Sequence, residues 1–404
     1  MRRLMFLLLS ILCIVPLGAA SAQSDDMPQA ERLLTLDLFG YVRGARWKAD
    51  ETRILGWAVS SAAHLWDAET GEKVAEYSQG GEIMHTVWNA DESRLLTFSS
   101  DDTIGMWDVE SGELLFTVAH EEEPGSPFGG YYDAGETRFL THSADGTVRV
   151  WDAATGDELL RLIHGDVIWG AGWNSDFSRI VSYSVDGVVN IWDAESGEIV
   201  HTLRHTDAVF GATWNADETL MLTWSQDDTV RVWDVETGEA LLILPHEGYV
   251  SSARWNADET RILSASGDDT ARVWDAETGA ELFALPHEDN VLDAAWNADE
   301  SRILSWSGDG TARIWDAETG EPLVLLAHEE TVSGAMWNSD ESRVLTWAWD
   351  DTAVIWDAET GQPLVVMAHE GAVSGATWNA DETLVLTWSQ DSTIGVWDVA
   401  GAME

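Results

Sequence analysis

Nine of the ten Trp-Asp dipeptides in the chain recur at nearly constant spacing. Consecutive copies are 41 residues apart, except for one interval of 44, and their tryptophans are Trp66, Trp107, Trp151, Trp192, Trp233, Trp274, Trp315, Trp356 and Trp397. A period of this length is typical of stacked or radially arranged units, each too small to bury its own apolar face. The 404 residues are therefore expected to form one repeat array, not the two or three domains that the length suggests.

Each period contains four short apolar runs. In the period that ends at Glu239, these runs cover residues 200–203, 209–214, 220–224 and 229–233, and Asn, Asp and Gly fill the gaps between them. Runs rich in Val, Thr, Leu and Trp favour strands, and the intervening residues favour turns. Gly238 and its counterparts stand where a turn needs a positive φ. Because no window shows sustained helical spacing, the pattern predicts an all-β protein.

The nine copies in register resemble the WD-repeat β-propeller family over residues 32–401. The resemblance implies a single closed β-propeller of four-stranded blades, in which each repeat supplies the outer strand of one blade and three strands of the next. Residues 33–38 match a lone outer strand, and the last repeat stops just after Asp398 without one. The first strand is therefore expected to complete the last blade and close the ring. Nine copies predict nine blades; a split arrangement that leaves two repeats outside a smaller ring is the alternative.

Seven histidines recur at one position of the repeat. The family resemblance implies that each belongs to a buried relay running from an indole N–H to a hydroxyl, an imidazole and a carboxylate. The clearest sets are His205, Thr223, Asp227, Trp233; His164, Ser182, Asp186, Trp192; His246, Ser264, Asp268, Trp274; and His369, Thr387, Asp391, Trp397. Three further sets are His120, Thr141, Asp145, Trp151; His287, Ser305, Asp309, Trp315; and His328, Thr346, Asp350, Trp356. A metal array or a general base is the other interpretation, but chemistry seldom needs seven copies of one base.

The first two repeats depart from the relay pattern. Leu38, Gly56 and Ser60 occupy three of its positions in the first repeat, and Gln79 replaces histidine in the second. We expect those two blades to be the least tightly determined.

The amino-terminal residues are typical of an export signal. Residues 1–22 combine Arg2 and Arg3, an apolar stretch and the small-residue sequence Ala20-Ser21-Ala22, which predicts a cleaved signal peptide; a membrane anchor is the alternative. Residues 23–31 are polar and aperiodic, so we expect a short flexible lead. Cleavage would remove Cys13, the only cysteine, and the exported protein would then be held together without disulfides.

The chain is strongly acidic, with a formal net charge of −51. A phosphate backbone or an anionic membrane surface would be repelled, so neither nucleic acid nor a membrane is an expected partner. Many acids fall in the repeated Asn-Ala-Asp-Glu and Ala-Glu-Thr-Gly-Glu turns, which a four-stranded blade places on one face of the ring. We interpret that face as solvated, because these turns lack the closely spaced ligands of a helix-loop calcium site.

The opposite face is where the repeats differ, and variation on a repeated scaffold favours recognition there. Met84, Phe128, Trp169 and Phe210 come from four consecutive blades and could form one apolar arc. With residues at neighbouring positions, the candidate partner-binding set is Tyr41, Met84, Phe128, Trp169, Phe210, Tyr249 and Trp349. Packing of some of these side chains between blades is the alternative.

The function that the sequence favours is an exported, non-catalytic scaffold, acting as a monomer, that binds a protein or peptide on its variable face. Phosphate loops, a nucleophile elbow and cysteine-histidine metal spacing are absent from the sequence, so no cofactor is expected. The alternatives are a propeller enzyme or small-ligand sensor that uses the central channel, and a secreted structural protein with no specific ligand. Fold alone does not decide among them.

Overall fold

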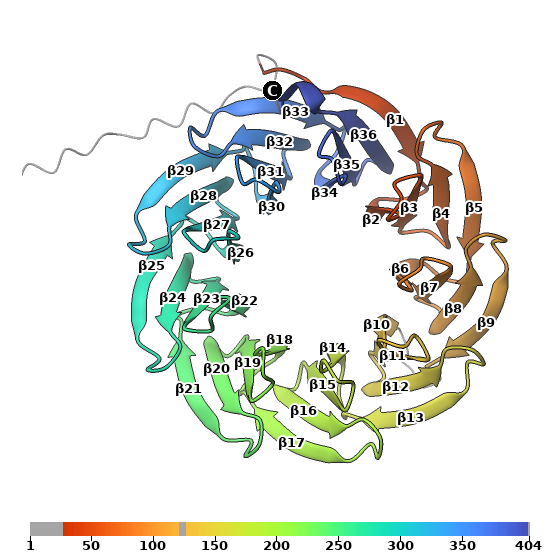
Figure 1. Ribbon diagram of the computed structural model, residues 1–404, viewed down its shortest axis with the longest axis vertical. Coiled ribbons are helices and arrows are strands. Elements are labelled where there is room, and N and C mark those ends of the chain that lie inside the picture. The colour runs from red at the N-terminus through yellow and green to blue at the C-terminus, as the bar shows by residue number, and fades with distance from the viewer. Residues whose placement is uncertain (1–26, 121–126, 403–404) are drawn as a thin grey trace, which may run out of the picture.

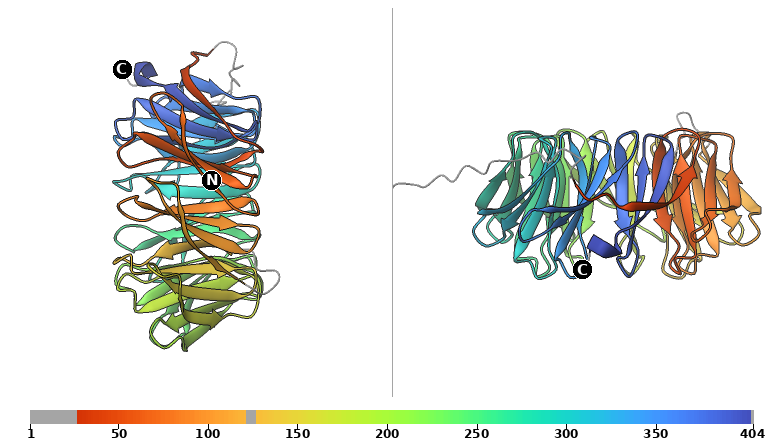
Figure 2. Two further views of the ribbon diagram at one scale, coloured as in Figure 1. Left: turned by 90° about the vertical axis from the view of Figure 1, so that its right-hand side faces the viewer. Right: turned by 90° about the horizontal axis from the view of Figure 1, so that it is seen from above.

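A computed structural model describes residues 27–120 and 127–402 of the protein. Nine four-stranded antiparallel sheets stand side by side around a central axis and form a ring (Figure 1). Seen from the side, the ring is a disc whose strands run between its two faces (Figure 2). The prediction of a single nine-bladed β-propeller is confirmed.

We number the blades in chain order, and within each blade the strands follow one another from the axis outward. Blades 1 to 3 consist of β2 (Val42–Trp47), β3 (Arg53–Ala58), β4 (Ala62–Asp67) and β5 (Lys73–Ser78); β6 (Ile83–Trp88), β7 (Arg94–Ser99), β8 (Thr103–Asp108) and β9 (Leu114–Ala119); and β10 (Pro127–Tyr132), β11 (Arg138–Ser143), β12 (Thr147–Asp152) and β13 (Glu158–Ile163). Blades 4 to 6 consist of β14 (Ile168–Trp173), β15 (Arg179–Ser184), β16 (Val188–Asp193) and β17 (Ile199–Arg204); β18 (Val209–Trp214), β19 (Leu220–Ser225), β20 (Thr229–Asp234) and β21 (Ala240–Pro245); and β22 (Val250–Trp255), β23 (Arg261–Ser266), β24 (Thr270–Asp275) and β25 (Glu281–Pro286).

Blades 7 and 8 consist of β26 (Val291–Trp296), β27 (Arg302–Ser307), β28 (Thr311–Asp316) and β29 (Pro322–Ala327); and β30 (Val332–Trp337), β31 (Arg343–Ala348), β32 (Thr352–Asp357) and β33 (Pro363–Ala368). Blade 9 consists of β34 (Val373–Trp378), β35 (Leu384–Ser389), β36 (Thr393–Asp398) and β1 (Glu31–Asp37). A single turn of 3-10 helix, Ala400–Ala402, follows.

The first strand closes the ring. β1 pairs antiparallel with β36 on the outside of blade 9, so blade 9 joins the two ends of the described chain (Figure 1). Arg32 of β1 donates a hydrogen bond to Thr393 at 2.8 Å, and its guanidinium lies 5.0 Å from the centre of the Trp397 ring. Blade 5 makes the equivalent contacts with Arg231 of its own third strand, a position that Gly395 occupies in blade 9. β1 therefore supplies the arginine that is missing from β36, the third strand of blade 9.

Part of the expected flexible lead is ordered. The backbone of Pro28 and of Ala30 hydrogen-bonds with Val366 of β33, and Glu31 already belongs to β1. Met27 and Ala30 also pack against apolar clusters of the ring. The prediction of a flexible segment over residues 23–31 is therefore wrong for residues 28–31, because β33 has a free outer edge with which an extended backbone can pair. The remainder of the lead lies outside the described residues.

The core consists of clusters shared between neighbouring blades. One cluster joins Val181, Val189, Ile191 and Leu203 of blade 4 to Val209, Met221, Trp233 and Val235 of blade 5. Since strand side chains alternate between the two faces of a sheet, each blade contributes apolar residues to the seam on either side of it. A blade buries these residues only when both neighbours are present.

A glycine opposite a tryptophan sets the spacing between the two innermost strands of several blades. Gly211 of β18 pairs directly with Trp224 of β19, and a Cβ atom on Gly211 would lie 1.9 Å from Cζ2 of that indole. The same arrangement occurs at Gly44 and Trp57, Gly334 and Trp347, and Gly375 and Trp388. In blade 6 the corresponding pair is Ser252 and Ala265. In blade 7 it is Asp293 and Trp306, and in blade 2 it is His85 and Phe98, so glycine is required only where the facing ring lies over the first position, as at Gly211.

Gly211→Ala is expected to destabilise the protein by about 1–3 kcal/mol, because the added methyl group overlaps the Trp224 ring. The double variant Gly211→Ser/Trp224→Ala reproduces the pair found in blade 6 and should recover part of that loss. Gly172→Ala is a suitable control, since a Cβ atom at Gly172 meets no other atom within 4 Å. Urea denaturation of the three variants provides the measurement, and equal losses for Gly211→Ala and Gly172→Ala would contradict the interpretation.

Candidate functional site

The relay residues of blade 5 form one continuous hydrogen-bond chain. The Trp233 indole N–H donates to Thr223 Oγ1 at 2.8 Å, and Thr223 Oγ1 lies 2.7 Å from His205 Nε2. Asp227 lies 3.0 Å from His205 Nδ1, and the Arg231 guanidinium donates to Asp227 at 3.0 Å. Every polar atom in the chain has a partner of the right kind if His205 is neutral and carries its proton on Nδ1.

The protonation states fit this arrangement. Burial lowers the pKa of His205, and this effect exceeds the opposing influence of its hydrogen bond to Asp227. Burial alone would raise the pKa of Asp227, but hydrogen bonds from His205, Thr229 and the backbone of Thr206 outweigh it and lower that pKa well below its usual range. A neutral imidazole beside a carboxylate results. The side chain of His205 has no solvent exposure, so it cannot meet a substrate.

Five further blades contain the complete hydrogen-bond chain. Imidazole–carboxylate distances of 2.9–3.1 Å, imidazole–hydroxyl distances of 2.7–2.8 Å and indole–hydroxyl distances of 2.7–2.9 Å occur in the sets of His120, His246, His287, His328 and His369. The repeated geometry ties the loop before each blade to the second and third strands of that blade.

The set of His164 departs from this geometry. Ser182 contacts His164 Nδ1 at 2.8 Å and accepts from Trp192 Nε1 at 2.8 Å, but the imidazole Nε2 lies 3.9 Å from Asp186 and has no hydrogen-bond partner among the described residues. Asp186 instead accepts from the Ser184 hydroxyl at 2.5 Å. Val188 and Asn190 stand where blade 5 has Thr229 and Arg231, so two side chains that would orient this carboxylate are missing. The contact expected between His164 and Asp186 is therefore not made.

Gln79 takes the place of the histidine in blade 2. Its amide lies 2.5 Å from Thr97 Oγ1 and 2.9 Å from Thr103 Oγ1, while the Trp107 indole donates to Thr97 at 2.7 Å. The Gln79 amide thus continues the hydrogen-bond chain in the place of a histidine ring. Leu38, at the corresponding position of blade 1, is simply buried in the core.

Trp233→Phe is expected to reduce stability by about 1–3 kcal/mol, because Thr223 and the buried relay lose a donor. Trp214→Phe is the matched control: the indole N–H of Trp214 has no partner among the described residues, so the same exchange breaks no hydrogen bond there. Thermal melting of both variants checks the expectation. An unchanged midpoint for Trp233→Phe would count against the relay.

A second set of ties, which the sequence did not reveal, crosses the seams between blades. In blade 6, Glu259 accepts hydrogen bonds from the Asn215 side chain at 3.0 Å and from the Ala216 backbone N–H in blade 5. Equivalent contacts are made by Glu136, Glu218, Glu300, Glu341 and Glu382, and Glu92 accepts from the backbone of Ala49. Glu51 of blade 1 accepts from Asn379 and Ala380 of blade 9 and thereby completes the circle.

These glutamates have an unusual backbone. Glu259 has a φ of 59°, and its counterparts at Glu51 and Glu218 have values of 56° and 59°. Residues other than glycine rarely adopt a positive φ. The hydrogen bonds across the seam help to offset the free-energy cost of this backbone conformation. For Glu218, burial alone would raise the pKa, but hydrogen bonds from Ser175 and Asn174 lower it. Part of the predicted solvated acidic face therefore holds adjacent blades together.

The seam between blades 3 and 4 lacks this tie. Asp133 replaces the asparagine and Phe177 replaces the glutamate, although Phe177 keeps a positive φ of 61°. Phe177 packs 5.9 Å from the Trp173 ring, and Arg138 lies 5.0 Å above the same ring and 3.1 Å from Asp133. Ring contacts and an ion pair thus replace the carboxylate tie at this seam.

The double variant Asp133→Asn/Phe177→Glu is expected to stabilise the protein by about 1–2 kcal/mol, because it installs a charged hydrogen-bond pair on a backbone already suited to it. Phe177→Glu alone places a carboxylate beside Asp133 and should destabilise, while Asp133→Asn alone should not raise stability. A double-mutant cycle from urea denaturation measures the coupling. Additive effects of the two changes would show that the tie does not form.

Three aromatic side chains form a cluster on the variable face. Trp169 and Phe210 stack with ring centres 5.0 Å apart and planes at 19°, and Tyr249 meets Phe210 edge-on at 6.1 Å. Trp169 is 46 % exposed and Tyr249 is 38 % exposed. We refer to Trp169, Phe210 and Tyr249 as the aromatic cluster; it spans blades 4, 5 and 6.

Local backbone irregularities position the cluster. Trp169 and Phe210 occupy the extra residue of a β-bulge near the start of β14 and β18, where pairing skips from Ile168 to Gly170 and from Val209 to Gly211. A bulge leaves its residue outside the ladder and turns the side chain away from the sheet. Tyr249 directly precedes β22 and lies over Gly267, where a Cβ atom would be 2.4 Å from the tyrosine ring.

The other candidate residues do not join the cluster. Phe128 is 38 % exposed and Met84 is partly buried, but no ring contact links Phe128 to Trp169 among the described residues. Tyr41 lies beside Arg43, whose guanidinium is 5.7 Å from its ring, and Trp349 is exposed in the β31–β32 turn of blade 8. The arc expected over blades 2 to 5 thus appears in the structure as a contiguous cluster over blades 4 to 6.

Acidic residues border the cluster. Asp166, Asp207 and Glu247 lie in the loops that lead to Trp169, Phe210 and Tyr249, and all three are exposed. The variable face is therefore aromatic at this site and negatively charged around it. In the described ranges, no three His, Cys, Asp or Glu side chains are placed to hold a metal ion.

The nine radial sheets and their repeated ties define the protein as a nine-bladed β-propeller. The family described as WD domain, G-beta repeat, matches residues 157–193, 197–234, 238–275, 280–316 and 361–398. Five of the nine repeats of the chain accordingly match the WD40 family, whose propellers typically serve as scaffolds for protein interactions.

A solved structure shares the architecture. The crystal structure of a computationally designed protein, Ika8, is similar with a TM-score of 0.61 and 25% sequence identity, over 80% of this chain and 97% of the designed one. None of the curated proteins matches the chain.

Proposed function

We propose that the protein is an exported, non-catalytic scaffold that binds a protein or peptide through the aromatic cluster on its variable face. The observation that carries this proposal is the stacked pair of Trp169 and Phe210 with Tyr249 against it, in which Trp169 and Tyr249 are exposed and Phe210 is partly buried. Rigid, exposed aromatic side chains at the centre of a surface are typical anchors of protein interfaces.

The charge around the cluster supports a partner with basic side chains. Asp166, Asp207 and Glu247 border the aromatic rings, and the whole chain carries a net charge of −51. A segment that presents an apolar side chain flanked by lysine or arginine would be attracted to this site and held at its rim. Nucleic acid and anionic membrane surfaces would be repelled by the same field.

The absence of a catalytic role is supported by the burial of the recurring histidines. His205, His246 and His287 have fully buried side chains engaged with carboxylates and hydroxyls. Groups that are inaccessible and repeated around the ring suit a structural purpose. A closed ring with its first strand in place also suits a monomer, because no unpaired blade remains to seek a second copy.

Export is supported by the sequence of residues 1–22, which lie outside the described residues. The described part of the chain contains no helix of the length and apolarity needed to cross a membrane.

Affinity capture from the extracellular or periplasmic fraction tests the proposal. The double variant Trp169→Ala/Phe210→Ala should lose the partners that the wild-type protein recovers, because it removes the apolar anchor; Trp349→Ala, at another exposed tryptophan, should retain them. Melting midpoints close to wild type would show that the exposed changes leave the ring intact. Amino-terminal sequencing of the recovered protein should start at Gln23 if the signal is cleaved.

Recovery of the same partners by the wild type and the double variant would exclude the aromatic cluster as the binding site. A mature chain that still began with residues 1–22 would exclude the cleaved signal and leave the binding proposal to be judged separately.

A further inference from the structure

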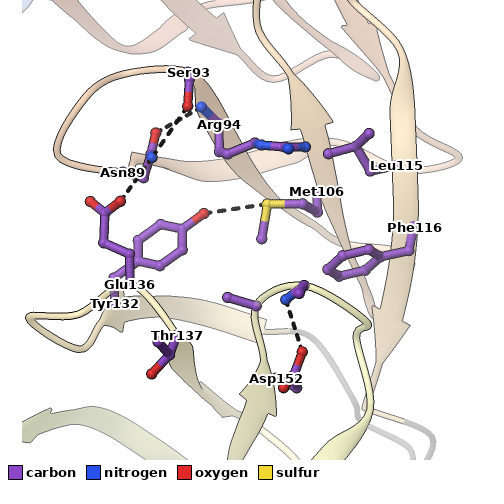
Figure 3. Close-up of a pocket in the computed structure, with 12 residues that line it drawn as sticks. Asn89, Ser93, Arg94, Met106, Leu115, Phe116, Tyr132, Glu136, Thr137 and Asp152 are labelled. Atoms are coloured by element: carbon purple, nitrogen blue, oxygen red, sulfur yellow. Dashed lines mark hydrogen bonds between the residues drawn. The ribbon is translucent and has the colours of Figure 1, made fainter.

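A cavity of about 690 Å³ lies at the seam between blades 2 and 3 (Figure 3). Its apolar walls are Met106 of β8, Leu115 and Phe116 of β9, and Tyr132 at the end of β10. Arg94, the first residue of β7, extends into it between Tyr132 and Leu115 (Figure 3). The pocket therefore combines a hydrocarbon and aromatic lining with one guanidinium group.

The guanidinium of Arg94 makes no hydrogen bond or ion pair with another side chain or carbonyl in the described ranges. The equivalent residue at the seam between blades 7 and 8 is Arg302. Its guanidinium lies 4.5 Å above the Trp337 ring, 3.1 Å from the Glu341 carbonyl and 3.5 Å from the Glu341 carboxylate. Arg138 and Arg261 also contact the blade that follows, whereas Arg53 and Arg343 pair with Asp67 and Asp357 of their own blades.

A substitution in blade 3 explains why Arg94 covers no indole. Tyr132 stands where the other eight blades have a tryptophan, and its hydroxyl turns to the Met106 sulfur at 3.3 Å. Arg138, at the equivalent position of blade 3, lies over Trp173 of blade 4 and so faces the next seam.

The two acids of the pocket are already engaged. Glu136 accepts from the Asn89 amide at 3.0 Å and from the Ala90 backbone, and Asp152 accepts from the backbone N–H groups of Ala154 and Thr155. Both lie away from the guanidinium in the pocket (Figure 3). Arg94 is therefore left without a hydrogen-bonded counter-ion in the pocket, although Asp91 and Asp108 lie close enough to interact with it electrostatically.

We propose that this pocket binds an apolar carboxylate, with the carboxylate paired to Arg94 and the hydrocarbon part packed against Met106, Phe116 and Tyr132. An arginine fork matches a carboxylate in two parallel hydrogen bonds, and the surrounding apolar walls strengthen that pairing. The same chemistry could come from a free organic acid or from the carboxyl-terminal residue of a peptide. The site is separate from the aromatic cluster and does not depend on the function proposed for it.

Isothermal titration calorimetry on the full chain at 0.15 M salt tests the proposal with two pairs of probes. The first pair is 4-phenylbutyrate and the neutral 4-phenylbutan-1-ol; the second is the peptide Gly-Gly-Phe and its carboxyl-terminal amide. At least one carboxylate should bind tenfold or more tightly than its neutral counterpart, and the tighter of the two carboxylates identifies the source.

Arg94→Met should weaken carboxylate binding tenfold or more, whereas Arg302→Met, at the seam where the guanidinium is already stacked, should leave it unchanged. Tyr132→Trp restores the residue found at this position in the other blades and gives Arg94 a ring to cover, so it should also abolish binding. This variant keeps the test decisive if Arg94→Met does not fold.

Three results would each overturn the proposal: no binding of either carboxylate, equal affinity for the neutral probes, or wild-type affinity in Arg94→Met or Tyr132→Trp. A loss of carboxylate binding in Arg302→Met equal to that in Arg94→Met would overturn it as well, because it would show a general effect of charge.

Discussion

The seam between adjacent blades is the interaction on which the whole structure depends. A four-stranded blade has apolar residues on both faces and covers neither by itself, so the core exists only where Val181 and Ile191 of one blade meet Met221 and Trp233 of the next. Each seam repeats this contact, and the last seam can form only if the ring closes. β1 and Glu51 supply that closure from the amino-terminal end, against β36 and Asn379. Stability is therefore shared around the ring, and the closing blade is as necessary as any other.

Three kinds of contact reinforce the ring, and only one of them crosses the seams. The relay of Trp233, Thr223, His205 and Asp227 is buried and fastens the entering loop to its blade. The glutamate ties lie nearer the surface and fasten a blade to the one before it at every seam except that between blades 3 and 4. Pairs such as Gly211 and Trp224 set the distance between the two innermost strands of one blade.

Much of this architecture could be predicted from the sequence. A period repeated nine times predicts the strands, the nine blades and the closing role of residues 33–38. Each copy shows the same order of apolar runs and turns, so the nine copies support one another. The hydrogen-bond chain around His205 followed from family resemblance, and six blades form it. Its failure at His164 could not be foreseen, since Val188 and Asn190 replace the threonine and arginine side chains that orient the carboxylate in blade 5. The order of residues 28–31 was also missed, because their partner, Val366, lies at the other end of the chain.

The glutamate ties show why acidic residues were hard to interpret. The turn Asn-Ala-Asp-Glu fits a solvated surface on composition alone, and the partner of Glu259 lies in the preceding blade, 43 and 44 residues away at Ala216 and Asn215. Only the three-dimensional ring brings them together. The departures from this regularity are consequently informative: Tyr132, Asp133 and Phe177 all fall in blades 3 and 4, and each removes a partner that a neighbouring polar group has elsewhere in the ring. Arg94 is left without an indole, and Arg138 is drawn to Asp133. Repetition pairs the relay and seam carboxylates internally, although it leaves indole N–H groups such as that of Trp214 without a partner among the described residues. The guanidinium of Arg94 becomes available to a ligand because it lies beside an exception.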